Sequence, residues 1–235
     1  MLAGVVIQEK ECFLKKCTMT FALKPRWERR KDARPQELLA AALDLFVERG
    51  FTATRLDEVA RNAGVSKGTL YLYFENKEEL FKAVVRENVV PGIVQAEQLM
   101  EHFDGSTEDL FRAMITLWWT GLTNSKLAGI CKLMFAEAGN FPELAKFYHD
   151  EVIVRHEQML IKLLERGMCN GEFRQLDITV MPKIITAPII MLMLWTHSFC
   201  VCQVHPTSVN DYIESYVESV LLGLRNHSHV TPLLE

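Results

Sequence analysis

The segment 55–74 constrains the fold of this chain most, because it contains two short helical patterns separated by one glycine. Apolar residues recur at helical spacing from Arg55 to Ala63 and predict a helix that stops at Gly64. Ser66 is a typical N-cap residue, so it predicts a second short helix from Lys67 to Tyr73. Two short helices joined by a tight glycine-containing turn form a helix-turn-helix motif, here at about residues 55–74.

Further helix signals flank this motif. Pro35 is typical of a helix N-terminus, and Gly50 supplies the left-handed conformation in which such a helix commonly ends. Thr54 is predicted to cap the first helix of the motif, and Asn76 to cap a fourth helix. Pro91-Gly92 should kink or break that fourth helix.

The composition favours an all-α protein, because only 12 of the 235 residues are Gly and 8 are Pro, placed where helices are expected to end. The net charge of −4 argues by itself against nucleic-acid binding. The average hides an asymmetry, since residues 24–34 hold six basic residues against two acidic ones, a local charge of +4. The basic residues Arg29, Arg30, Lys31 and Arg34 are therefore either a DNA-contacting arm or a solvated tail.

The stretch 34–85 resembles the N-terminal domain of the TetR family of bacterial regulators. The resemblance is carried by LFVERGF, AGVSKGTLYLYF and NKEELF, which keep their spacing without a gap. It implies a homodimer of all-α subunits that binds double-stranded operator DNA and a small-molecule effector. We expect a mobile, partly basic arm at 1–31, a three-helix DNA-binding head completed by the fourth helix at 32–92, and a larger ligand-binding and dimerisation domain at 93–235.

The same resemblance implies the DNA contacts, which come from the second helix of the motif and the ends beside it. Carried over by position, these residues are Thr54, Ser66, Lys67, Gly68, Thr69, Tyr71, Tyr73 and Lys77. The residue types suit the task, since Lys and Tyr offer donors and a bare glycine lets the backbone approach a phosphate closely. Leu72 departs from the family pattern, and it either touches a thymine methyl or caps the core.

The C-terminal domain is interpreted from its pattern. Two long helices, Ile178–Cys202 and Val209–Leu224, are implied to pair with their copies in a dimer bundle. The uncharged run 184–204 is broken by Pro188 and by polar residues, which argues against a transmembrane helix. A mostly apolar ligand is expected among residues that are equally explained as plain core: Trp118, Trp119, Met134, Phe135 and Trp195. His149 and His197 either hydrogen-bond the ligand or are satisfied interior histidines, and Glu137 needs a partner, which is Lys132, another side chain or the ligand.

Several function classes are excluded. The six cysteines are scattered without the spacing of a metal site, so we expect no metal and no cofactor. No catalytic motif is present, so the chain is not expected to be an enzyme. The N-terminus, which begins at Met1 or Met19, lacks the pattern of a secretory signal, so a cytoplasmic protein is expected. The resemblance therefore implies a repressor that a ligand releases from a palindromic operator, or alternatively an activator or architectural protein without an inducer.

Overall fold

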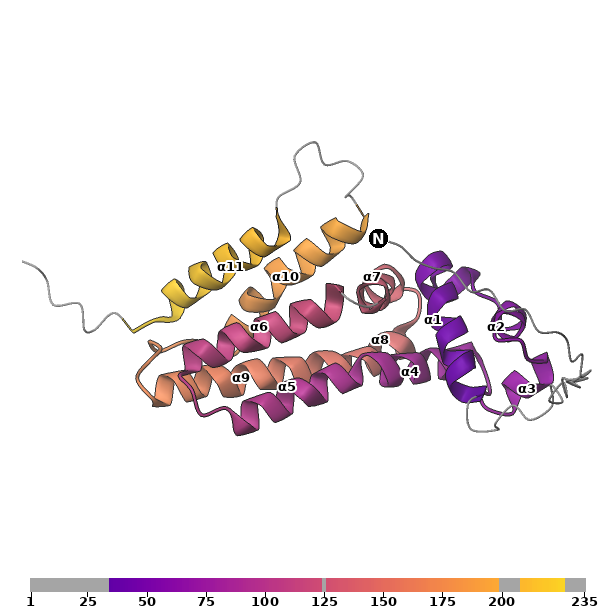
Figure 1. Cartoon of the computed structure of the whole chain (residues 1–235), viewed down its shortest axis with the longest axis horizontal. Coiled ribbons are helices and arrows are strands. Elements are labelled where there is room, and N and C mark those ends of the chain that lie inside the picture. Colours follow the sequence, from indigo (N-terminus) through magenta and orange to yellow (C-terminus); the bar gives the residue numbers. More distant parts are fainter. Residues whose placement is uncertain (1–33, 124–125, 199–207, 227–235) are drawn as a thin grey trace, which may run out of the picture. The chain divides into compact units, whose positions relative to one another are not determined.

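The computed structural model describes residues 34–123, 126–198 and 208–226, and these form helices connected by short loops (Figure 1). The part of the chain so described contains no strand beyond an isolated bridge between Phe173 and Arg225, so the predicted all-α class is confirmed. The helices are α1 (Arg34–Ala53), α2 (Leu56–Asn62), α3 (Lys67–Tyr71), α4 (Lys77–Asn88), α5 (Val90–His102), α6 (Thr107–Thr123), α7 (Leu127–Glu137), α8 (Pro142–Tyr148), α9 (Val154–Cys169), α10 (Met181–Ser198) and α11 (Val209–Leu224).

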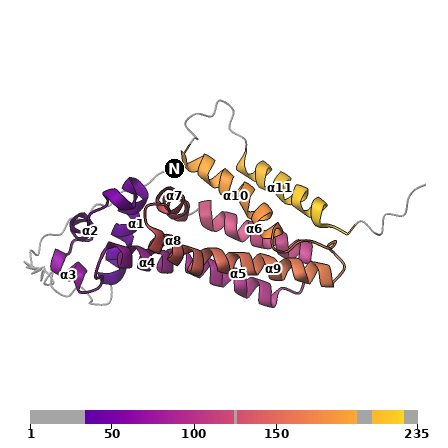
Figure 2. The ribbon, with the colours of Figure 1, turned by 180° about the vertical axis from the view of Figure 1, so that it is seen from behind.

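Two hydrophobic clusters hold these helices together. The first, which we call the head core, lies among α1–α4 and also takes buried side chains from α7 and α8, such as Leu133 and Leu144. The second, the body core, lies among α5, α6, α9, α10 and α11, and Figure 2 shows α5 and α9 running alongside each other in this region. Helices α7 and α8 therefore complete the packing of the N-terminal helices although they come much later in the chain.

Local sequence signals set the ends of the N-terminal helices. Gly50 has φ 83° near the end of α1, and Gly64 has φ 67° between α2 and α3, as the predicted turns require. The Ser66 hydroxyl accepts from the backbone N–H of Thr69, and the Asn76 side chain accepts from that of Glu79. Both predicted caps are confirmed.

The predicted break after the fourth helix is also confirmed. Helix α4 ends at Asn88 and α5 begins at Val90, with Pro91 in its first turn where the missing N–H costs nothing. The head core and the body core are therefore connected by two consecutive helices, α4 and α5, rather than by one continuous helix.

Helix α10 has a proline in its middle, and α11 donates hydrogen bonds to the carbonyl groups near this proline. Pro188 cannot donate to the preceding turn, and it crowds the carbonyls of that turn. The Tyr216 hydroxyl of α11 donates to the carbonyl oxygen of Ile185 at 2.6 Å, and the Tyr212 hydroxyl to that of Pro188 at 3.3 Å. Within the described ranges no helix, α10 included, is long and apolar enough to cross a membrane.

Candidate nucleic-acid interface

Helix α3 rests on the head core through one side chain and presents the rest to solvent. Leu70 is fully buried, while Lys67, Gly68 and Tyr71 are exposed. Leu70 belongs to the head core, in which three rings stack or meet edge to face with centroids 5.3–5.7 Å apart: Phe46, Phe51 and Phe81. Helix α3 is therefore anchored through Leu70 to a closely packed aromatic core.

The outward polar groups of α3 are positioned by neighbours on the same surface. The Lys67 ammonium lies 2.7 Å from a carboxylate oxygen of Asp57 in α2 and 5.9 Å from the ring centroid of Tyr71. The hydrogen bond between Lys67 and Asp57 raises the pKa of Lys67 and lowers the pKa of Asp57, so both side chains are charged at neutral pH. The Ser66 and Thr69 hydroxyls are 2.8 Å apart. The structure thus brings together a cation, two hydroxyls and a phenol on one exposed surface.

Asp57 is a functional candidate that sequence reasoning missed. It lies in the first turn of α2, where no side-chain cap forms. Its carboxylate instead holds the Lys67 side chain across the surface of the motif. A DNA phosphate that approaches Lys67 therefore has to compete with this carboxylate for the ammonium.

Thr54 corrects one expectation. The sequence predicted an N-cap, yet the residue that precedes α2 is Arg55 and it makes no side-chain cap. The Thr54 side chain is 1% exposed, and its hydroxyl lies 2.7 Å from the carbonyl oxygen of Gly50 and 3.1 Å from that of Leu45. The buried Thr54 hydroxyl therefore stabilises the C-terminal end of α1 and is not accessible to DNA.

Lys77 is held in a comparable way. Its ammonium donates to the carbonyl oxygens of Phe51, Thr52 and Thr54, at 2.7, 3.1 and 3.1 Å. It also lies 4.5 Å from the Phe51 ring centroid, and burial lowers its pKa below the ordinary value. All three donors of the ammonium are in use, so the side chain stabilises the α1–α2 connection rather than reaching for a phosphate.

Most of the predicted arm lies outside the described residues. Arg29, Arg30 and Lys31 lie outside the described residues, and Arg34 begins α1. The described part of the interface therefore consists of α3 and the residues beside it: Asp57, Ser66, Lys67, Gly68, Thr69, Tyr71, Leu72 and Tyr73.

The structure does not bring the eight predicted ligand residues together. Trp119 belongs to the body core and Met134 to the head core, whereas Phe135 is 60% exposed. Glu137 lies beside the end of α1, within 3.4 and 3.5 Å of the Thr52 hydroxyl and backbone nitrogen. The expectation that these eight residues line one pocket is wrong. Helix α7 packs against α1, so Met134 and Glu137 lie in or beside the head core rather than in the body core.

The remaining candidates lie apart from one another as well. His149 is exposed and pairs with Asp150, and Trp195 and His197 are exposed on α10. One surface cavity of about 460 Å³ lies between α4 and α8, and another of about 430 Å³ between α10 and α11. None of the eight residues lines either of these cavities.

Trp118 does meet a polar partner inside the body, one that the sequence analysis did not single out. The imidazole of His156 on α9 lies 4.6 Å from the Trp118 ring and 3.2 Å from the Thr186 hydroxyl on α10. Burial lowers the pKa of His156 to about 4, so the ring is neutral at physiological pH. A signal existed, because His156 lies three and four residues before the buried Met159 and Leu160 on one face of α9.

Comparison with known proteins agrees with this arrangement. Residues 38–84 match the sequence model of the bacterial regulatory proteins of the tetR family. The chain is 46% identical over 69 residues to the HTH-type transcriptional activator FasR of Mycolicibacterium smegmatis, covering 28% of this chain and 32% of FasR. It is 25% identical over 158 residues to the fatty acid metabolism regulator protein of Bacillus subtilis, covering 66% of this chain and 80% of that protein.

The fold extends the similarity beyond the N-terminal helices. The crystal structure of a transcriptional regulator FadR from Bacillus subtilis in complex with stearoyl-CoA superposes with a TM-score of 0.68 at 22% identity. The superposition covers 81% of this chain and 99% of that one. FasR and a second relative, YfiR of Bacillus subtilis, are matched over about a third of their length, 32% and 35%.

Proposed function

We propose that the chain is a TetR-family regulator, on the match of its residues 38–84 to that family's model, and that it binds a near-palindromic operator sequence-specifically as a homodimer. The observation that carries this proposal is the surface of α3. Lys67, Thr69 and Tyr71 project from a short helix whose buried side is fixed by Leu70. In a helix-turn-helix protein the second helix of the motif lies in the major groove and contacts base edges and phosphates.

The experiment is selection of sites from random duplex DNA, followed by fluorescence anisotropy at physiological salt. We expect an enriched site made of two inverted half-sites about one helical turn apart or slightly more. Binding to it should be at least ~10³-fold tighter than to scrambled duplex. A pool without any enriched sequence would contradict the proposal.

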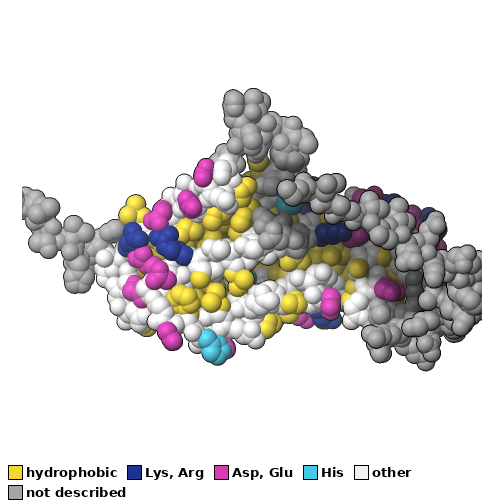
Figure 3. Space-filling view, in the orientation of Figure 1, with side chains coloured by type: hydrophobic (Ala, Val, Ile, Leu, Met, Phe, Trp, Pro, Cys, Tyr) yellow, Lys and Arg dark blue, Asp and Glu magenta, His cyan; other side chains and the backbone are white. Residues whose placement is uncertain are grey.

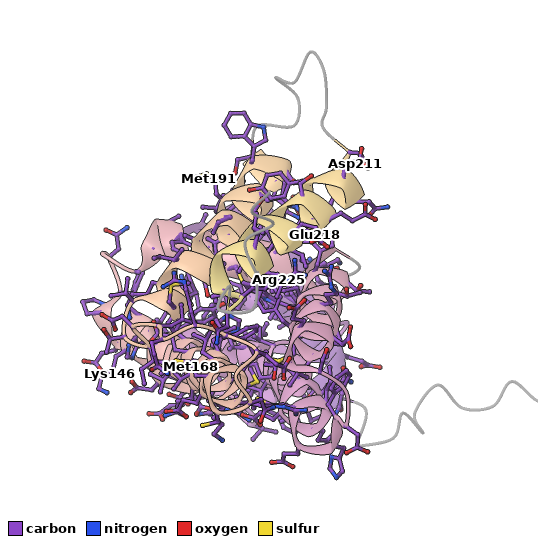
Figure 4. All side chains as sticks on the ribbon, turned by 90° about the vertical axis from the view of Figure 1, so that its left-hand side faces the viewer. Lys146, Met168, Met191, Asp211, Glu218 and Arg225 are labelled. Atoms are coloured by element: carbon purple, nitrogen blue, oxygen red, sulfur yellow. The ribbon has the colours of Figure 1, made fainter. Side chains whose placement is uncertain are left out.

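The dimer is proposed to form through α10 and α11. Helix α10 has two apolar sides: Ile185, Ile189 and Met193 are buried in the body core, whereas Ile184 and Met191 are 53% and 58% exposed. Figure 4 shows Met191 on the outer side of α10, and Figure 3 shows apolar side chains gathered over this part of the body. The cavity between α10 and α11 continues this surface and is lined by Met181, Ile184, Pro188 and Val220 among others.

An exposed apolar strip along a helix is typical of a surface that a partner covers. A second copy of this chain is the partner that a two-fold symmetric operator requires, because inverted half-sites mirror the symmetry of a dimer. Since the protein would act on chromosomal DNA, the proposal also locates it in the cytoplasm.

The effector is proposed to be a small, mostly apolar molecule that enters the body core and releases the repressor from its operator. The support is the chemistry of the core, which is built from Leu, Met, Ile and aromatic residues. The name of the fatty acid metabolism regulator among the relatives makes fatty acyl compounds the first class to screen. Saturable thermal stabilisation by an acyl compound, together with loss of operator binding, is the expected result.

A second candidate function is activation of transcription, which the name of FasR favours. Transcription in vitro from a promoter that carries the selected operator decides between the two. A repressor lowers transcript yield in the absence of effector, whereas an activator raises it.

A further inference from the structure

Leu72 is an apolar side chain that the packing of the head leaves in water. It follows the last residue of α3, and its side chain is 83% exposed. Among the large hydrophobic residues that the structure describes, none is more exposed. The sequence left two roles open for it, and this exposure excludes the role of capping the core.

The direction of Leu72 follows from its helical conformation. Its backbone continues the turn of α3 with φ −69° and ψ −24°. Successive helical residues are rotated by about 100°, so Leu72 lies about 200° from Leu70, the residue that anchors α3 to the core. Gly68, four residues earlier, is on the same outward face and has no side chain. Leu72 is therefore the apolar projection of the face that α3 turns away from the protein.

The whole of α3 is short enough for its C-terminal end to reach base edges. Its five residues span about 7.5 Å at 1.5 Å per residue, and the major groove is about 12 Å wide. Tyr71 and Tyr73 on either side of Leu72 are exposed as well. DNA that contacts Tyr71 and Tyr73 at the C-terminal end of α3 therefore also comes close to Leu72.

We propose that Leu72 is a specificity-determining residue that recognises a thymine through its 5-methyl group in the major groove. The inference rests on the proposed function, in which α3 enters that groove. Thymine is the base that presents an apolar group there, while the other bases present hydrogen-bond donors and acceptors. A leucine side chain has neither donor nor acceptor, so a methyl contact is the way in which it can favour one base pair.

The test replaces thymine by deoxyuridine, which removes only the methyl group, at each position of the selected operator in turn. Burial of one methyl-sized apolar group corresponds to about a fourfold change in affinity. For the wild-type dimer we expect one position in each half-site at which uracil weakens binding about fourfold per half-site. The Leu72→Ala variant should bind the thymine and uracil operators equally.

A matched control is Lys67→Ala on the same helix. It should bind both operators more weakly and keep the difference between thymine and uracil, because a phosphate contact does not depend on the base. Thermal unfolding of Leu72→Ala should match that of the wild type, since the side chain is exposed.

Two results overturn the inference: indifference of the wild type to uracil at every position, or a thymine preference that persists in Leu72→Ala. A wild-type protein that selects no DNA sequence at all overturns the proposed function instead, so the two failures are distinguishable.

Discussion

At the scale of single residues, Lys77 shows how tertiary contacts decide what a basic side chain does. In the sequence Lys77 follows Asn76, the cap residue of the fourth helix. A lysine at a helix N-terminus can bind a phosphate together with the free backbone N–H groups there. In the structure the Lys77 ammonium donates to three carbonyl oxygens in the last turn of α1 and just after it. These carbonyls have no partner within α1, so Lys77 does for this helix what a C-capping side chain does.

Replacement of Lys77 by Met keeps most of the stem and removes the ammonium. We expect the free energy of unfolding to fall by about 1–3 kcal/mol, because partly buried carbonyl acceptors lose a charged donor. The slope of operator affinity against salt should stay as in the wild type, as measured by anisotropy at several salt concentrations. The control is Lys67→Ala, which should leave stability unchanged and reduce that slope by about one ion. If Lys77→Met reduces the slope while stability is unchanged, the side chain is a phosphate contact after all.

His156 makes stability depend on pH. An unfolded histidine titrates near 6.5, whereas burial lowers the folded pKa to about 4. Between these values the unfolded state binds the additional proton, so stability is complete above pH 6.5 and falls as the pH drops toward 4. The loss attributable to this residue is up to about 3 kcal/mol.

Chemical denaturation of wild type and His156→Gln at pH 7 and pH 4.5 measures this contribution. The difference in unfolding free energy between the two pH values should be smaller in the variant, because the amide does not titrate. If the unfolding free energy depends on pH equally in both proteins, the pKa of His156 is not lowered by folding.

At the scale of elements, α7 connects the two cores. Gly129 of α7 lies against Val47 of α1, and a Cβ atom at this glycine would lie 2.5 and 2.7 Å from the two methyl carbons of Val47. One turn further along α7, the Lys132 ammonium donates to the carbonyl oxygen of His197 at the end of α10. A displacement of α10 can therefore be transmitted to α1 through α7.

Gly129→Ala should lower the free energy of unfolding by about 1–3 kcal/mol, because the valine is stiff and the methyl group has no room. Gly121→Ala in α6 is the matched control, since a Cβ there has nothing within 4 Å. It should stabilise the protein by about 0.4–1 kcal/mol through the smaller entropy of the unfolded chain. Urea denaturation compares the two, and a neutral Gly129→Ala would mean that α1 and α7 separate easily.

These elements also show what the sequence could and could not predict. The caps at Ser66 and Asn76 and the turns at Gly50 and Gly64 depend on a few neighbouring residues, so local patterns predict them correctly. The roles of Lys77 and Glu137 depend on which helix packs against the end of α1, and those helices lie up to 85 residues further along the chain. The ligand residues were predicted as one set for the same reason: their helices were identified, but their division between two cores was not.

At the scale of the whole molecule, α10 has to be covered by a second subunit for the proposed dimer to exist. Met191→Glu places a charge in the middle of the exposed apolar strip, whose desolvation on pairing is costly. We expect the variant to run as a monomer in analytical ultracentrifugation and to lose most operator affinity. The control is Gln158→Glu on the exposed side of α9, which adds the same charge away from this strip. A dimeric Met191→Glu variant would exclude this surface as the interface.

The central claim is that α3 reads DNA from the surface formed by Lys67, Thr69 and Tyr71. The direct measurement is the ratio of affinities for the selected operator and for scrambled duplex, at physiological salt, in wild type and in Tyr71→Ala and Lys67→Ala. We expect weaker operator binding in both variants, with the ratio reduced about tenfold or more by Tyr71→Ala. Full operator affinity and an unchanged ratio in both variants would contradict it.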